Sequence, residues 1–188
     1  MKLNRRQIAF LDLETTGLYP GTHEIIEAAV IKGQHIFHVY VRPDRIEVAQ
    51  PEALKLNGYN PKEWESGVSQ KYLAQKLACI LEDCIIVGHN PRFDVEFIEC
   101  LFEEHAVPIG IDRRAVDTMT LAYLYLVPLG LDSLSMDSIR SFMGWEVRAK
   151  HNALDDAKDV QRLYNIFSSA HRFGWYIKHF LSSIWGGK

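Results

Sequence analysis

The segment Gln7–Glu14, QIAFLDLE, most constrains the fold because it is an almost continuous apolar run that carries two carboxylates. Such a run is typical of a β-strand covered on both faces. Side chains alternate along a strand, so Asp12 and Glu14 point to the same face, toward a covering layer. Two adjacent buried carboxylates are unfavourable unless they bind protons or a cation lies between them. The pair alone is equally compatible with a strand end that reaches solvent.

The rest of the apolar pattern predicts an α/β fold with a mixed sheet. Two strands at residues 24–32 and 34–42, joined by Gly33, form a predicted hairpin, and shorter strands follow at 84–89 and 114–118. Apolar spacing and capping residues predict helices at 69–83, from Pro91 onward, and at 119–127, 132–143 and 153–170. Three strands followed by alternating strands and helices indicate an α/β sandwich.

The length of 188 residues fits one domain, which we expect at residues 1–170. Residues 171–188 are expected to form a helical tail packed on that domain, or an apolar surface for a polymerase partner or a second copy. The apolar side chains of this tail are Trp175, Tyr176, Phe180, Leu181, Ile184 and Trp185. The net charge is -3 and the sequence contains no long basic run, so composition alone does not indicate a nucleic acid ligand.

Composition also predicts a cytoplasmic protein without a membrane span. The longest apolar run, LAYLYLVPLGL, is too short for a bilayer and is interrupted by Pro128. The N-terminus lacks the apolar core of a signal peptide. Cys79, Cys84 and Cys100 form no CxxC pair, so we expect reduced core thiols and neither a disulfide framework nor a zinc cluster.

A second acidic site is predicted in GHNPRFDVEF. Asn90 as N-cap and Pro91 at the first helical position would begin a helix. Asp94 then lies in the first turn, on the same face as Phe97, Ile98, Leu101 and Phe102. A favourable interaction with the helix dipole would explain an acid in the first turn. It does not explain why this acid faces the core.

The third acidic site, HNALDDAKDV, contains two neighbouring aspartates that the helical period separates. With Asn152 as N-cap, Asp155 shares a solvated face with Lys158, Asp159 and Arg162, and we interpret it as structural. Asp156 shares the apolar face with Val160, Leu163 and Phe167. His151 lies just before the helix, within reach of Asp156, and is a candidate for proton transfer.

These three sites are expected to meet at one edge of the sheet, where strands end and helices begin. Oxygen ligands without a Cys or His pair suit Mg²⁺ or Mn²⁺ rather than zinc. Four carboxylates are enough for two divalent cations, an arrangement used in phosphoryl displacement.

The ordered motifs Asp12-x-Glu14, Asp94 and His151-x4-Asp156 resemble those of the DEDDh, or DnaQ-like, 3′–5′ exonucleases, over residues 7–168. The resemblance implies an RNase H-like fold, hydrolysis from a 3′ end and two Mg²⁺ or Mn²⁺ ions. It implies that Asp12, Glu14, Asp94 and Asp156 bind metal and that His151 is the general base.

The resemblance also implies a nucleotide site beside the metal ligands. Thr15 and Thr16 would lie near the sugar-phosphate of the terminal nucleotide, and Leu18 against its base. Further candidates are Leu56, Asn57, Tyr59, His89, Asn90 and Phe93. For His89, Asn90 and Phe93, capping and packing roles explain the residues equally well.

Three functional interpretations remain open from the sequence. We favour DNA as the substrate, although an exoribonuclease would carry the same motifs and nothing in the sequence reads a 2′-hydroxyl. A non-catalytic nucleic-acid-binding or polymerase-accessory protein could keep the fold, but it would be free to lose the acids. A structural domain with incidental acids would not explain why all three acidic sites face inward.

Overall fold

The computed structural model describes residues 7–108 and 110–169. Its centre is a five-stranded mixed sheet with the strand order β3-β2-β1-β4-β5. The strands are β1 (Gln7–Thr15), β2 (Ile25–Lys32), β3 (His35–Tyr40), β4 (Cys84–Gly88) and β5 (Ala115–Asp117). The first three strands pair antiparallel, and β4 and β5 continue the sheet parallel to β1. The mixed sheet predicted from the sequence is therefore confirmed.

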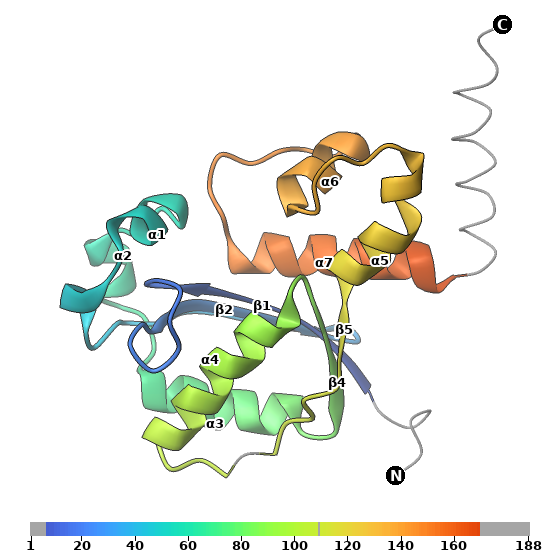
Figure 1. Cartoon of the computed structure of the whole chain (residues 1–188). Helices are drawn as coiled ribbons and strands as arrows, with labels where there is room; N and C mark the ends of the chain where they lie inside the picture. Colours follow the sequence, from blue (N-terminus) through green and yellow to red (C-terminus); the bar gives the residue numbers. More distant parts are fainter. Residues whose placement is uncertain (1–6, 109, 170–188) are drawn as a thin grey trace, which may run out of the picture.

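Helices cover the sheet on both faces (Figure 1). One face carries α3 (Gln70–Leu81) and α4 (Pro91–Glu104), and the other carries α5 (Thr118–Tyr125), α6 (Met136–Phe142) and α7 (Ala153–Ser168). Two short helices, α1 (Pro51–Leu56) and α2 (Pro61–Trp64), lie at one end of the sheet, and the 3₁₀ turns η2 (Ile46–Val48) and η3 (Val127–Leu129) complete the chain. Trp64 anchors α2 by donating its indole N–H to the carbonyl of Ile26 at 2.6 Å.

The central strand β1 separates two hydrophobic cores. Ala9, Leu11 and Leu13 pack with residues of α3 and α4. Phe10 packs on the opposite side, against Val160 of α7. Since side chains alternate, Asp12 and Glu14 lie on the same face as Phe10 and point toward the α7 layer. The inward direction expected for both acids is confirmed.

Local capping explains where several helices begin. The Ser69 side chain accepts a hydrogen bond from the backbone N–H of Tyr72, and Asn152 accepts one from Asp155, as predicted for N-caps. The prediction that a helix begins at Asp132 is wrong. Ser135 caps α6 through the N–H of Ser138, so the helix starts only at Met136.

The cysteine prediction is correct only in part. Cys84 is buried, but Cys79 is exposed and Cys100 is partly exposed. Cys79 has apolar neighbours in the sequence, which is why a core position was predicted. The helical period nevertheless places it away from the buried face of α3. Among the described residues, no helix is both long and apolar enough to cross a membrane. The tail predicted at residues 171–188 lies outside the described residues.

Candidate active site

The end of β1 places two acids beneath the first turn of α7. Glu14 is 6% exposed and Asp12 is partly buried. A register shift between Glu14 and Thr15 marks the point where β1 leaves regular pairing with β2. The polypeptide then turns into the loop that follows Thr15. Both carboxylates are thus held by a central strand rather than by a mobile surface segment.

Glu27 is a third acid in this layer, and it is absent from the site residues predicted from the sequence. It lies opposite Glu14 in the β1–β2 pair and is 1% exposed. Its Oε1 accepts a hydrogen bond from Asn152 Nδ2 at 2.6 Å and lies 2.7 Å from His38 Nε2. A single acid within the apolar run IIEAAVIK was the available signal, and it resembles the pair of acids in the run that contains Asp12 and Glu14.

Asp94 reaches the same region from the other face of the sheet. It lies in the first turn of α4 and is 5% exposed, with Phe97, Ile98, Leu101 and Phe102 buried along its face as predicted. Its carboxylate accepts hydrogen bonds from its own backbone N–H and from that of Leu13. The bond from Leu13 attaches the start of α4 to β1.

Asp156 in the first turn of α7 and His151 just before this helix complete the cluster. His151 Nδ1 lies 3.4 Å from Asp156 Oδ2. One potential ligand atom each from Glu14, His151 and Asp156 lies within 4.8 Å of the others. Asp156 also accepts hydrogen bonds on Oδ1 from Arg140 and Arg148.

The electrostatics of the cluster favour a bound cation. Burial, followed by the charges of Asp94 and Glu14, raises the pKa of Asp12 well above its ordinary value. Burial and the charge of Asp156 raise the pKa of Glu14 to about 9. Burial raises the pKa of Asp94 to about 8, although two backbone N–H groups oppose the shift. Burial raises the pKa of Asp156 as well, against the opposing charge of Arg140. A hard divalent cation would relieve this repulsion, and the oxygen-rich donor set fits Mg²⁺ or Mn²⁺.

The loop after β1 is held together by its own threonines. Thr15 Oγ1 donates to the carbonyl of Gly17 at 2.7 Å, and Thr16 Oγ1 accepts from the N–H of Glu24 at 2.9 Å. Leu18 instead is 64% exposed. The loop therefore uses its hydroxyls internally and presents an apolar side chain outward.

Residues of α1 and its C-terminal end lie beside this loop. Asn57 is buried and donates through Nδ2 to the carbonyl of Thr15 at 3.0 Å. The carbonyl of Leu56 accepts a hydrogen bond from the backbone N–H of His151 at 3.2 Å, while the Leu56 side chain is 49% exposed. Tyr59 packs near Trp64, with ring centroids 5.3 Å apart. Leu56 and Asn57 thus join the loop at Thr15 to the segment that carries His151.

Two of the candidate residues around the start of α4, His89 and Phe93, have clear structural partners. Nδ1 of His89 lies 2.9 Å from Thr118 Oγ1, and its Nε2 lies 2.8 Å from the carbonyl oxygen of Leu134. Phe93 packs near Phe97, with centroids 4.8 Å apart. Asn90 occupies the N-cap position, but its predicted capping by the side chain is wrong. Within the described chain its side chain makes no capping hydrogen bond, and its φ of 65° is left-handed.

The two neighbouring aspartates separate as the helical period predicted. Asp155 is partly exposed and accepts a hydrogen bond from Lys158 Nζ at 2.9 Å, whereas Asp156 is buried. The solvated face predicted for Asp159 is wrong. Asp159 is 6% exposed, because Arg140 and Arg148 bind its Oδ2 at 2.8 and 2.9 Å.

This fold and this acidic cluster define a member of the exonuclease family. The family model described as "Exonuclease" matches residues 9–164, so the chain belongs to that family. The family predicted from the three motifs is confirmed.

Among its relatives is the PolC-type DNA polymerase III of Thermotoga maritima, 33% identical over 159 residues that cover 82% of this chain and 11% of the relative. The DNA polymerase III epsilon subunit of Pasteurella multocida is 29% identical, over 85% of this chain and 66% of that subunit. This chain therefore spans about a tenth of the length of the PolC-type relatives.

Solved structures confirm the predicted RNase H-like fold. E. coli exonuclease I in complex with a dT13 oligonucleotide superposes with a TM-score of 0.74 at 20% identity, over 95% of this chain and 46% of that protein. The apo form of exonuclease I gives a TM-score of 0.73 over 95% of this chain and 47% of that one.

Proposed function

We propose that this protein is a metal-dependent 3′–5′ exonuclease that releases 5′-mononucleotides from the 3′ end of DNA. The observation that carries the proposal is the convergence of Asp12, Glu14, Asp94, Asp156 and His151 in one buried cluster of a chain that belongs to the exonuclease family. A structural cluster of acids would not need a histidine at its partly exposed side.

We infer that the cluster holds two divalent cations, Mg²⁺ or Mn²⁺. Asp12, Glu14, Asp94 and Asp156 would hold the ions through their carboxylate oxygens. When bound, such ions neutralise charge on the scissile phosphate and on the attacking and leaving oxygens. The raised pKa values of Asp12 and Glu14 support this assignment, because burial and neighbouring carboxylates raise both.

His151 is the proposed general base. Its Nδ1 faces Asp156 Oδ2 at 3.4 Å, so the N–H of the neutral ring is best placed on Nδ1, where the carboxylate can accept it. Nε2 then keeps its lone pair and can take the proton from the attacking water. The side chain is 33% exposed, which leaves the ring accessible to substrate and solvent.

The nucleotide would bind between the loop after β1 and α1. The exposed side chains of Leu18 and Leu56 provide apolar contacts for the terminal bases. Thr15, Thr16 and Asn57 would shape this site through their contacts within and beside the loop. Tyr59, His89, Asn90 and Phe93 are weaker candidates, because each can be explained by its structural environment. An association with a polymerase is a further proposal, supported by the names of the relatives.

Digestion of end-labelled nucleic acids tests this function. Single-stranded and duplex DNA and RNA, labelled at the 3′ or the 5′ end, are incubated with Mg²⁺, Mn²⁺ or EDTA. We expect release of mononucleotides from the 3′ end of DNA and complete inhibition by EDTA. Activity that persists in EDTA would contradict the metal-dependent mechanism, and digestion from the 5′ end would contradict the polarity.

The same panel distinguishes the alternatives. Faster digestion of RNA than of DNA would make the protein an exoribonuclease with the same cluster. Binding of nucleic acid without digestion in either metal would favour an accessory role. A catalytically impaired control, His151→Ala, separates true activity from a contaminating nuclease, since a contaminant would survive the substitution.

A further inference from the structure

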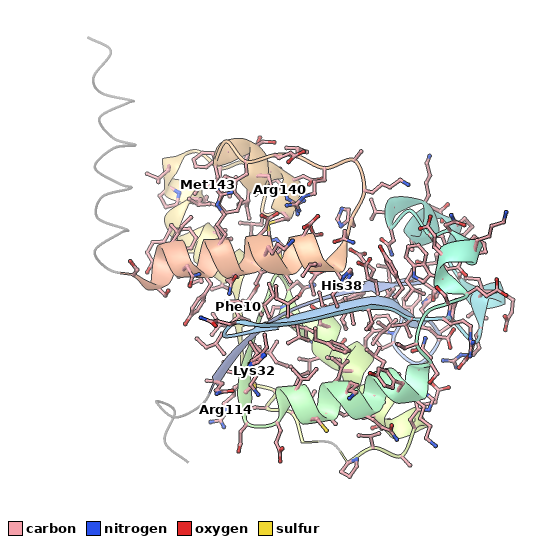
Figure 2. All side chains as sticks on the ribbon, turned by 180° about the vertical axis from the view of Figure 1, so that it is seen from behind. Phe10, Lys32, His38, Arg114, Arg140 and Met143 are labelled. Atoms are coloured by element: carbon pink, nitrogen blue, oxygen red, sulfur yellow. The ribbon has the colours of Figure 1, made fainter. Side chains whose placement is uncertain are left out.

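Arg140 is a buried cation that the proposed chemistry does not use. Its side chain is 1% exposed, although it belongs to α6 in the layer of α6 and α7 above the sheet (Figure 2). A buried guanidinium normally requires several anionic partners. Arg140 has three, because Nη1 donates to Asp137 at 2.7 Å, Nε donates to Asp159 at 2.8 Å, and Nη2 donates to Asp156.

The two oxygens of the Asp156 carboxylate have different partners. Oδ1 accepts hydrogen bonds from Arg140 Nη2 and from Arg148 Nη1, the latter at 3.2 Å. Oδ2 lies on the side of His151, 3.4 Å from its Nδ1. With Oδ1 fixed by two guanidinium groups, the carboxylate cannot rotate freely about its last bond.

Arg140 is itself held in one orientation. Asp159 lies one turn beyond Asp156 on α7 and binds the Nε edge of the guanidinium. A planar guanidinium gripped at Nε and Nη2 by two carboxylates of one helix has a defined plane. Arg148 contacts the same two acids, but it comes from the loop before α7 and is 26% exposed. Arg140 is therefore the more rigid of the two supports.

We infer that Arg140 is a positioning residue, which orients Asp156 so that Oδ2 is directed toward the metal cluster. It touches neither substrate nor metal and acts only through Asp156. The inference rests on the proposed metal site of the preceding subsection. The inference thus gives a function to Arg140 and Asp159, two charged residues that lie next to the acidic cluster without belonging to it.

Calorimetric titration of the metal-free protein with Mn²⁺ tests this role. Arg140→Lys retains the positive charge but loses the planar fork. Loss of a group that orients a metal ligand typically weakens metal binding about 10- to 100-fold, so we expect a Kd for Mn²⁺ at least about tenfold higher. Asp137→Asn is the matched control. It removes a partner of the same guanidinium that does not touch the cluster, and should leave the Kd within about twofold.

A second variant keeps the test decisive if Arg140→Lys fails to fold. Asp159→Asn leaves Arg140 in place but weakens the grip on Nε, and should raise the Kd for Mn²⁺ by a smaller factor, about threefold or more. A purely structural role would lower the melting temperature of the variants and leave the Kd unchanged. Unchanged Kd values in every variant that folds would overturn the inference.

The titration also separates this inference from the proposed function. A wild-type protein that binds Mn²⁺ but digests no nucleic acid would refute the exonuclease, while the effect of Arg140 on Mn²⁺ binding could still be measured. A wild-type protein that binds no Mn²⁺ would overturn both the metal site and the role of Arg140.

Discussion

Replacing Glu14 by Gln should stabilise the metal-free protein at neutral and alkaline pH while it abolishes the proposed activity. Glu14 is buried beside Asp156 and Glu27, and this environment raises its pKa from 4.5 to about 9. The folded protein therefore binds a proton that the unfolded chain releases. The contribution of Glu14 to stability is fully present below a pH of about 4.5 and is lost as the pH rises toward 9.

The size of the effect follows from the same shift. Each pH unit above 4.5 removes about 1.4 kcal/mol from the free energy of unfolding, with a ceiling of about 5 kcal/mol at pH 8. The neighbouring acids Asp12 and Asp94 also have raised pKa values, and a neighbour that holds a proton no longer repels Glu14, so we take roughly half of this ceiling. We expect Glu14→Gln to be more stable than the wild type by about 2–3 kcal/mol at pH 8, and nearly equal to it at pH 4.5.

Urea unfolding in EDTA, followed by circular dichroism at both pH values, measures this difference. Glu146→Gln, at an exposed position, is the control and should match the wild type at both. Saturating Mn²⁺ should reverse the order of stability, because only the wild type retains the complete set of ligands. A variant that is less stable than the wild type at pH 8 in EDTA would refute the reasoning, since Glu14 would then be in a favourable environment.

Three further predictions concern the neighbouring aspartates, the metal and the loop. Asp156→Ala should abolish exonuclease activity, whereas Asp155→Ala should retain it. Asp155→Ala should cost about 1 kcal/mol of stability, measured by urea unfolding, because the charge at the helix end and the ion pair with Lys158 are lost. The opposite pattern would mean that the helical faces are misassigned. Mn²⁺ should raise the melting temperature of the wild type but not of Asp156→Ala, as thermal unfolding with and without the ion would show. Gly17→Ala should cost about 1–3 kcal/mol and raise the KM for DNA, because a Cβ there would lie 2.4–2.7 Å from the buried ring of His23. Gly110→Ala, with no atom within 4 Å of its Cβ, is the control and should be neutral.

The main elements of the fold could be predicted because local patterns determine them. The strand at Gln7 and the helices α3, α4 and α7 each combine a clear apolar period with a turn or capping signal. The start of α6 could not be placed, because several polar residues before Met136 are plausible caps and only the contact of Ser135 with Ser138 selects one.

The inward acids could be predicted for a related reason. Asp94 and Asp156 each begin an apolar face, so helical geometry alone directs them toward the core. Asp159 could not be predicted in the same way. Its burial depends on Arg140, which lies 19 residues earlier in the chain and meets it only after α6 packs on α7. Long-range charge pairs of this kind leave no periodic signal in a single sequence.

The hydrogen bond between the His151 N–H and the Leu56 carbonyl has a mechanical consequence. It attaches the segment that carries the proposed base to the helix that would contact the terminal base of the substrate. Asn57 extends the attachment to Thr15, next to the acid Glu14. The end of α1, the loop at Thr15 and the segment of His151 are therefore joined by hydrogen bonds. A movement of α1 by more than a hydrogen-bond length must also displace His151. A substitution in α1 that weakens substrate binding should consequently also lower the rate of the chemical step.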